Sequence, residues 1–428
     1  MPGHKGRDGL LSVEHLDLTE IDGADELFRA EGIIRESERN AGELFGADTF
    51  YSAEGSSLAI RTMLLLAVKW AYRQGLADEE HRPVILAGRN AHKVLIHTSA
   101  LLDFDTQWIY PKEDAAYQTC AVTGEDLLAA LDTGIRPVAL YVTSPDYLGN
   151  LTDLKPLAEI CHSRGILLLT DNAHGAYLKF LDPSLHPMDC GADMCADSAH
   201  KTMPVLTGGA YLHLSRRLDD FFKEEAREAM EVFASSSPSY LILESLDLNN
   251  PYMERLPALL RDFLPKVGRL REELLDAGFR LTGDEKLKIT IEAFRRGYTG
   301  DELAGILREA GIFSEYHDHD YLVLMLTPQN TDEELRRFGD TLRGIEPRPE
   351  IAPDDCTVKR PERVMSPRRA LLTPTETVTK EESTGRVFAS ASVSCPPAVP
   401  VCMLGEAVPD GKMLPGNGEV KVVKAPEL

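Results

Sequence analysis

Apolar runs and helix-like stretches alternate along residues 83–170, and no other feature constrains the fold as strongly. The runs 83–87, 137–143 and 166–170 consist mostly of apolar side chains. Continuously apolar strands are typical of a parallel sheet that is covered on both faces. We therefore expect an α/β fold with a doubly wound large domain. The expected helices are 91–102, 125–131 and 154–164, and 107–110 is expected to form a further short strand.

A smaller α+β unit is expected next along the chain. Residues 256–277 have the spacing of a connecting helix, and residues 287–293 and 321–327 have the pattern of strands. Two possible capping boxes, in which side chains at a helix start bond to its free N–H groups, mark further helices. They are Thr299 with Glu302 and Thr331 with Glu334.

The composition changes sharply near residue 346. Residues 347–428 hold 12 of the 26 prolines, yet they keep clusters of Val, Ala and Leu. We expect a small loop-rich domain or an ordered arm there. The expected domains are an N-terminal segment (1–46), a large domain (47–249), a small α+β domain (250–345) and a Pro-rich C-terminal domain (346–428).

The charge balance argues against two classes of partner. Lys and Arg total 46 against 69 Asp and Glu, which gives a formal net charge of −23. So acidic a chain is a poor ligand for nucleic acid or an anionic membrane, and no apolar stretch approaches the ~20 residues of a membrane helix. The seven cysteines show no framework spacing and are expected to be reduced. We expect a cytoplasmic protein.

Two charged residues lie where a doubly wound sheet places its ligands, beyond the carboxyl ends of the strands. Asp171 follows the apolar run 166–170, and Lys201 lies thirty residues later among small and apolar neighbours. Alone, the aspartate could be a turn cap and the lysine a solvated surface charge. A desolvated lysine, however, can also form a Schiff base with a carbonyl compound.

Two further groups of residues could bind a planar, anionic ligand. His92 follows the strand at 83–87, where an imidazole could stack on a ring or be an ordinary polar residue. Residues 51–57 are expected as a turn that leads into a helix over 58–74. Small residues and free N–H groups at a helix start can bind an anion, although a plain Ser N-cap is the commoner case.

The four groups together match the needs of pyridoxal 5′-phosphate (PLP). The cofactor requires an amine for the Schiff base, a carboxylate at the pyridine nitrogen, a ring-stacking side chain and a phosphate site. The combination is much more specific than any of its parts, and we expect PLP as the cofactor.

The same segments resemble the Orn/Lys/Arg decarboxylase family of fold-type-I PLP enzymes, in its short bacterial form. The likeness covers almost the whole chain. The matching segments are Pro2-Gly-His-Lys-Gly6, 34–50, Arg89-Asn-Ala-His-Lys93, 143–149, Asp171-Asn-Ala-His-Gly175, Ser198-Ala-His-Lys201, Ser236-Ser-Pro-Ser-Tyr240, Ser366-Pro-Arg-Arg-Ala370, Gly385-Arg386 and Pro396-Pro-Ala-Val-Pro400.

The resemblance implies a fold-type-I, aspartate-aminotransferase-like large domain and a role for each site residue. Lys201 would form the Schiff base, Asp171 would pair with the pyridinium nitrogen, and His174 would lie near cofactor and substrate. His92 would stack on the ring. Around the phosphate would lie Ser56, Ser57, Ser198 and His200, with Ser237 reaching it across a homodimer interface.

Four departures from the family pattern stand out. Asp197 replaces the usual Gln before Ser-x-His-Lys, and Asp146 stands where relatives often have Thr. Thr207-Gly-Gly209 replaces a turn that usually contains Gln. Ala398 follows the paired prolines, where relatives usually have Gly.

The resemblance predicts decarboxylation of arginine, lysine or ornithine to the amine and CO2. The acidic composition could steer such cationic substrates. One alternative is another fold-type-I reaction such as transamination, for which Arg89 could hold a carboxylate. Another is a non-catalytic PLP-binding or regulatory protein, which the intact Lys201, Asp171 and His92 argue against.

No metal site is expected. Cys190 and Cys195, with His186 nearby, lack the paired spacing of a zinc site. The two histidines of the segment 317–320 are more simply explained as a solvated strand edge.

Overall fold

The computed structural model describes residues 1–7, 9, 11–112, 115–354, 360–391, 396–414 and 418–425. Its centre is a seven-stranded sheet with the order β1-β7-β6-β5-β4-β2-β3. The five strands from β6 to β3 run parallel, whereas β7 is antiparallel to both of its neighbours. The strands are β1 (Asp48–Ser52), β2 (Val84–Gly88), β3 (Asp105–Ile109), β4 (Ala139–Thr143), β5 (Leu167–Asp171), β6 (Met194–Asp197) and β7 (Ala210–Leu214).

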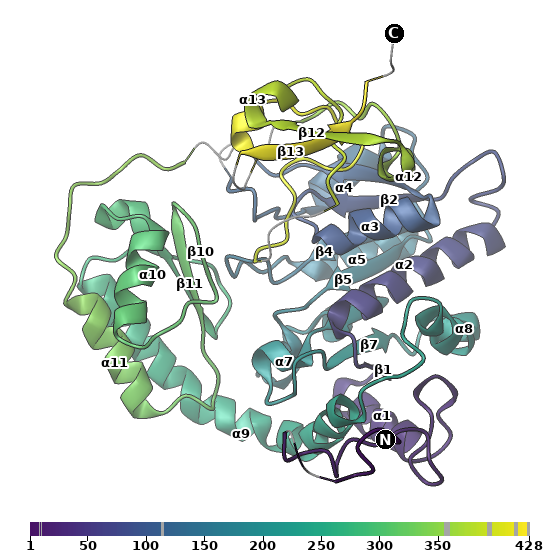
Figure 1. Ribbon diagram of the computed structural model, residues 1–428, viewed down its shortest axis with the longest axis horizontal. Coiled ribbons are helices and arrows are strands. Elements are labelled where there is room, and N and C mark those ends of the chain that lie inside the picture. Colours follow the sequence, from purple (N-terminus) through teal and green to yellow (C-terminus); the bar gives the residue numbers. More distant parts are fainter. Residues whose placement is uncertain are drawn as a thin grey trace.

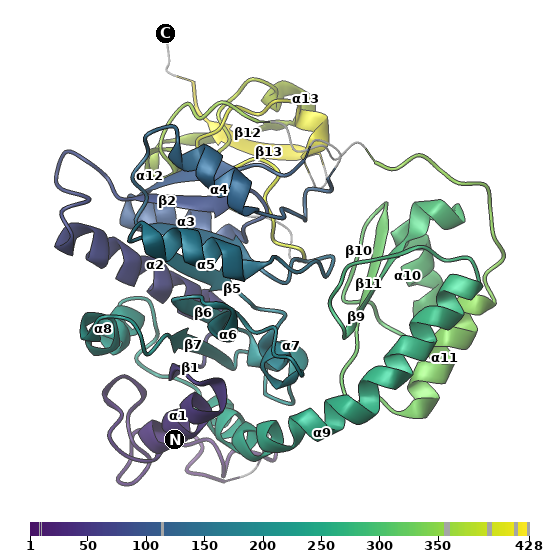
Figure 2. The same ribbon diagram turned by 180° about the vertical axis from the view of Figure 1, so that it is seen from behind.

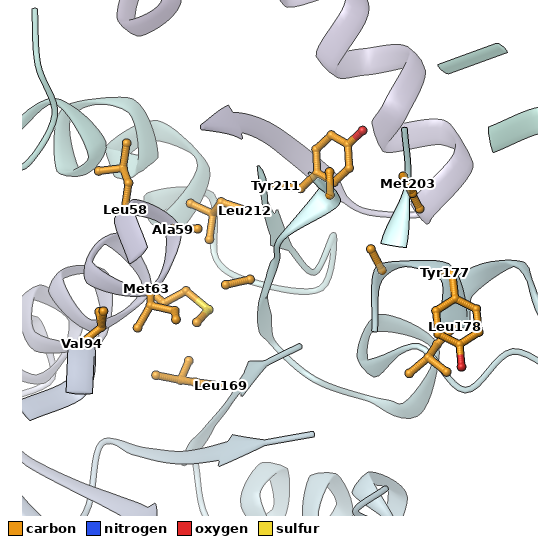
Figure 3. Packing of buried hydrophobic residues seen from close by; sticks show 14 of the residues in the cluster. Leu58, Ala59, Met63, Val94, Leu169, Tyr177, Leu178, Met203, Tyr211 and Leu212 are labelled. Atoms are coloured by element: carbon orange, nitrogen blue, oxygen red, sulfur yellow. The ribbon is translucent and has the colours of Figure 1, made fainter. Parts of the chain in front are cut away.

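Helices cover both faces of this sheet, as the apolar strands predicted (Figures 1 and 2). On one face α2 (Gly55–Arg73), α3 (Lys93–Leu102) and α8 (Asp220–Glu231) pack over the sheet, and α4 (Gly124–Leu131) and α5 (Leu154–Ser163) pack on the other. Figure 3 shows Met63 of α2 between Leu169 of β5 and Leu212 of β7. The predicted doubly wound α/β class is confirmed.

The turn was predicted at 51–57, which is too early at its start and too late at its end. Tyr51 and Ser52 belong to β1, and α2 already begins at Gly55. Gly55 has φ +73, and its N–H donates to the carbonyl of Gly208 at 2.7 Å. The chain therefore reverses within two residues, because glycine allows the left-handed conformation without a Cβ penalty.

The connecting helix was also predicted too short. α9 runs from Tyr240 to Asp276, so it begins well before residue 256 and contains Pro251, Pro257 and Pro265. Prolines normally end or kink a helix, but here buried side chains such as Leu246, Met253 and Leu260 hold the helix against its neighbours. Packing has outweighed local preference, and Figure 1 shows α9 crossing from the large sheet to the smaller one.

The smaller sheet has the order β10-β11-β9-β8 and lies beyond α9. Thr299 and Thr331 form the predicted capping boxes at the starts of its two helices. Its elements are β8 (Leu281–Thr282), β9 (Lys288–Glu292), α10 (Gly300–Glu309), β10 (Tyr316–His317), β11 (Tyr321–Met325) and α11 (Asp332–Arg343).

The described part of the C-terminal segment packs onto the large sheet beside α3 (Figure 1). It consists of α12 (Pro367–Leu372), α13 (Lys380–Ser383) and the strand pair β12 (Thr375–Thr379) and β13 (Glu419–Val423). At the other end of the molecule α1 (Ile33–Phe45) packs against α9. The domain limits given above stay predictions. None of the helices in the described ranges combines the length and apolarity that crossing a bilayer requires.

Candidate active site

Asp171 is the last residue of β5, and its carboxylate lies at the carboxyl end of the parallel strands. The side chain is buried, with Oδ2 accepting from the hydroxyl of Tyr141 at 3.0 Å and Oδ1 from the N–H of Ala173 at 3.2 Å. Burial raises the pKa of Asp171, while the Tyr141 hydrogen bond and the positive charge of Lys201 act to lower it. Strand geometry thus fixes a desolvated carboxylate at the site that the apolar run predicted.

Lys201 lies on the short helix α7 (Ala199–Thr202), and its Nζ is 2.9 Å from Nε2 of His174. His174 is buried, and both its desolvation and the charge of Lys201 hold its pKa well below the ordinary value. A neutral imidazole accepts a hydrogen bond from an ammonium group through its unprotonated nitrogen. The pair therefore has a defined polarity, with Lys201 as donor and His174 as acceptor.

His92 has a fixed tautomer because it is the N-cap of α3. Its Nδ1 accepts from the N–H of Val94 at 3.2 Å, so the proton of the neutral ring is on Nε2. Burial and the charge of Lys201 lower the pKa of His92 to about 3. The ring is thus uncharged over the physiological range.

These four side chains line one cavity. Lys201, Asp171, His174 and His92 share its wall with residues from three other segments. The other lining residues are Asn90, Gln118, Thr143, Pro145, Tyr147, Ala173, Pro397 and Val399. The structure therefore brings together every residue predicted to contact the cofactor ring.

The residues predicted around a phosphate gather at the N-terminus of α2. The hydroxyl of Ser198 donates to Ser56 Oγ at 2.7 Å, and Ser57 lies in the first turn of the helix. Nδ1 of His200 is 3.0 Å from the carbonyl of Gly209. Free N–H groups and hydroxyls at the start of a long helix suit an anion.

Ser237 does not line the cavity in the single chain. It lies on the exposed loop after α8, where the N–H of Ser235 donates to Glu54 Oε1 at 2.7 Å. The loop thus reaches the start of α2 in its own chain, and its role across an interface stays a prediction.

Arg89 does not offer its guanidinium to a substrate carboxylate, as the transamination alternative would require. It is buried, with Nη2 2.9 Å from Glu406 Oε2, and it also donates to the carbonyls of Pro400 and Val401. The guanidinium instead holds the C-terminal segment against the turn that carries His92.

The carboxylate of Glu315, beside the smaller sheet, contacts Tyr147, which lines the cavity. The hydroxyl of Tyr147 donates to Glu315 Oε1 at 3.2 Å, and the Tyr147 ring packs edge-on against His174 with 4.9 Å between centroids. Neither Tyr147 nor Glu315 was singled out from the sequence. Tyr147 lies in the segment 143–149 that carries the family resemblance, which is the one signal that could have indicated it.

Comparison with known proteins identifies the family. A model described as "Orn/Lys/Arg decarboxylase, major domain" matches residues 12–293, well over half of the chain. The chain belongs to the Orn/Lys/Arg decarboxylase family. Members of this family are PLP-dependent amino-acid decarboxylases, and the predicted enzyme class is confirmed.

Curated relatives resemble the chain over nearly its full length. The uncharacterized protein YaaO of Bacillus subtilis (strain 168) is 30% identical over 424 residues, which span 94% of this chain and 84% of that protein. An arginine decarboxylase of the same organism is 28% identical, covering 95% and 87%.

Solved decarboxylases share its fold. The Francisella novicida lysine decarboxylase LdcF superimposes with a TM-score of 0.80 at 17% identity, covering 99% of this chain and 78% of that one. The constitutive lysine decarboxylase of E. coli gives 0.76, again at 17% identity, with coverage of 99% and 79%. At this identity the likeness supports the predicted fold-type-I architecture and nothing finer.

One buried cluster in this Orn/Lys/Arg decarboxylase family member has the composition of a metal site. Ligand atoms of His186, Cys195 and Asp197 lie within 4.8 Å of one another. However, Nδ1 of His186 accepts from the N–H of Met188, so its Nε2 carries the proton and donates to Asp197 Oδ2 at 2.9 Å. Asp197 Oδ2 is also 3.2 Å from Nε2 of His213, so the cluster as the structure shows it is a buried hydrogen-bond network around Asp197.

Proposed function

We propose that this chain binds PLP through Lys201 and decarboxylates a basic amino acid, arginine, lysine or ornithine, to the amine and CO2. One observation carries the proposal. A lysine amine and a buried carboxylate, Lys201 and Asp171, face the same cavity between two neutral histidines.

The donor set around the cavity fits PLP. Asp171 can hold a proton on the pyridine nitrogen, and the start of α2 with Ser56, Ser57 and Ser198 can bind the phosphate. Three buried polar atoms of lining residues, Nδ1 of His174, Oδ1 of Asn90 and Oγ1 of Thr143, have no partner within the described residues and could serve a polar ligand. When bound, PLP would supply an electron sink, which accepts the electron pair of the bond between Cα and the departing carboxylate.

The chain's own residues would orient the reactants and control protons. His174 accepts from Lys201 Nζ and so fixes the direction of the amine. His92, uncharged and held as the N-cap of α3, can present its flat face to the cofactor ring. Pro397 and Val399 of the C-terminal segment close the cavity and would exclude water.

The position of Glu315 supports a substrate with a cationic side chain. Its carboxylate lies beyond Tyr147, on the side of the cavity that faces the smaller sheet. The net charge of −23 would also favour the approach of a cation.

We further propose that the enzyme works as a homodimer. The two segments that bond to the start of α2, through Gly208 and Ser235, carry exposed apolar side chains: Leu206 is 51% exposed and Val232 62%. The exposed Ser237 loop lies beside them. Such a surface is suited to a second copy of the chain.

The test is to purify the protein with PLP and record its visible spectrum and CO2 release. We expect an absorption band that is absent in Lys201→Ala, and CO2 from at least one of arginine, lysine and ornithine. A keto acid in place of CO2 would indicate the aminotransferase. Bound cofactor without either product would indicate a regulatory protein and contradict the proposal.

A further inference from the structure

The buried lysine Lys288 and the loop between β4 and α5 form a connection between the two sheets that the reaction above does not use. Lys288 is the first residue of β9 and is only 1% exposed. Its Nζ donates to the carbonyls of Asp146 at 2.9 Å and Tyr147 at 3.3 Å, and lies 5.7 Å from the centroid of the Tyr147 ring. An ammonium group is rarely buried so deeply without a specific partner.

The same loop accepts further bonds from the smaller sheet. Thr290 Oγ1 donates to the carbonyl of Leu148 at 2.8 Å. The N–H groups of Asp284 and Glu285 donate to the carbonyl of Gly149 at 2.7 and 2.8 Å. Four consecutive carbonyls, from residue 146 to residue 149, are thus each bonded by a donor of residues 284–290.

The loop in turn presents Tyr147 to the cavity. The Tyr147 ring contacts His174 edge-on, and its hydroxyl donates to Glu315. His174 is the acceptor for Lys201. A shift of the loop would therefore move the ring that packs against the partner of the reactive amine.

We propose that Lys288 is a positioning residue, which ties the loop 144–150 to the smaller sheet and so holds Tyr147 against His174. The inference rests on the proposed function, since it assigns Lys288 a place in that same site. Lys288 acts through Tyr147 and does not touch the reacting atoms.

The charged groups around Lys288 favour its ionised form, and the ionised form is the one that anchors the loop. The carboxylates of Glu285, Asp146 and Glu315 stabilise the ammonium, and Lys201 opposes it. Burial is the largest influence and lowers the pKa of Lys288 to about 8. The ammonium therefore persists at neutral pH, where its charge also acts to lower the pKa of the buried Glu285, which burial raises.

Hydrogen exchange of the PLP-loaded protein tests the anchor without relying on activity. In Lys288→Met the amides of residues 144–150 should exchange about tenfold faster or more, because the loss of a buried charged hydrogen bond releases the loop. Lys286→Met is the matched control, since Lys286 is exposed two residues away. Unchanged exchange in the loop of a folded Lys288→Met would overturn the proposal.

Kinetics test the route through Tyr147. Lys288→Met should lower kcat by about 10- to 100-fold, the cost of misplacing a contact at a site, while the Lys201-dependent absorption band remains. In a Tyr147→Ala background, which removes the ring that packs against His174, the additional loss should be smaller, because coupled residues are non-additive. Full additivity would overturn the role of Tyr147. If the wild type itself releases no CO2, the proposed function fails, and the exchange result still decides the anchor.

If Lys288→Met does not fold, Thr290→Val provides a second variant, because it removes one uncharged bond to the same loop. It should increase exchange at 144–150 with little change in the visible band. If residues 144–150 of this variant exchange as slowly as in the wild type, and kcat is also unchanged, the proposal is contradicted.

Discussion

Arg89 and Glu406 form an ion pair of 2.9 Å that is almost completely buried, with 1% and 4% of the two side chains exposed. The pair joins the turn before α3 to the C-terminal segment, and Glu406 also accepts from the N–H of Met403 at 2.7 Å. Pro397 and Val399 of that segment line the cavity. The Pro-rich tail is therefore part of the wall of the cavity proposed as the active site.

Removing one partner of this pair should be costly. Glu406→Ala leaves the Arg89 guanidinium buried without its counter-ion, and we expect the free energy of unfolding to fall by about 3–5 kcal/mol. Urea denaturation measures the loss. Glu362→Ala is the control, because Glu362 is an exposed carboxylate of the same segment. Equal stability of Glu406→Ala and wild type would show that the pair contributes nothing.

Asp171 and Tyr141 should differ in their effect on turnover. Asp171→Asn removes the charge proposed to secure the pyridinium proton, and we expect kcat to fall by about 100-fold or more. Tyr141→Phe removes only the donor to Asp171 Oδ2, and a lost hydrogen bond to a charged group corresponds to about tenfold. Single-turnover CO2 release measures both. A larger loss in Tyr141→Phe than in Asp171→Asn would contradict this order.

Local sequence patterns predicted the elements whose burial follows from their own residues. The apolar run before Asp171 made β5 and its terminal carboxylate predictable, and the capping boxes at Thr299 and Thr331 marked two helix starts. Contacts between distant segments could not be found in this way. Arg89 was a candidate for holding a substrate carboxylate in the transamination alternative, because its partner, Glu406, lies 317 residues away in the sequence.

The site residues that the sequence analysis missed were missed for the same reason, because their contacts join distant segments. Lys288 is the first residue of β9 and Glu315 directly precedes β10, and nothing in their own sequence neighbourhood indicates that they face the loop carrying Tyr147. The early start of α9 was missed because Pro251 and Pro257 suggest a break, and only packing against other elements overrides that preference.

Ala398 should tolerate replacement by glycine better than other buried alanines do. It is fully buried with φ +57, a conformation that costs a residue with a Cβ roughly 1–2 kcal/mol. Its carbonyl accepts from the N–H of Lys93, next to His92. Ala398→Gly should change the free energy of unfolding by less than about 1 kcal/mol, because relief of the left-handed conformation offsets the lost burial of the methyl group and the entropy of glycine. Ala389→Gly, at a buried alanine that is not among the residues of positive φ, should be destabilising in the same urea assay.

The buried histidine His92 gives a pH dependence whose sign can be derived. Burial lowers its pKa from 6.5 to about 3, so between these values the unfolded chain binds a proton that the folded chain does not. Stability contributed by this group is therefore complete above about pH 6.5 and is lost as the pH falls, by ~1.4 kcal/mol per pH unit.

Other groups titrate in the same range, so the prediction concerns a difference between two proteins. Asp146, with a pKa raised to about 6, acts in the opposite direction, and His174 in the same one. These contributions cancel when wild type and His92→Gln are compared without PLP. The glutamine variant should show a slope of unfolding free energy against pH, between pH 6 and 4, that is smaller by about 1.4 kcal/mol per unit. Parallel slopes would mean that His92 takes up a proton in the folded protein, and a charged ring could not be the neutral stacking partner proposed for the cofactor.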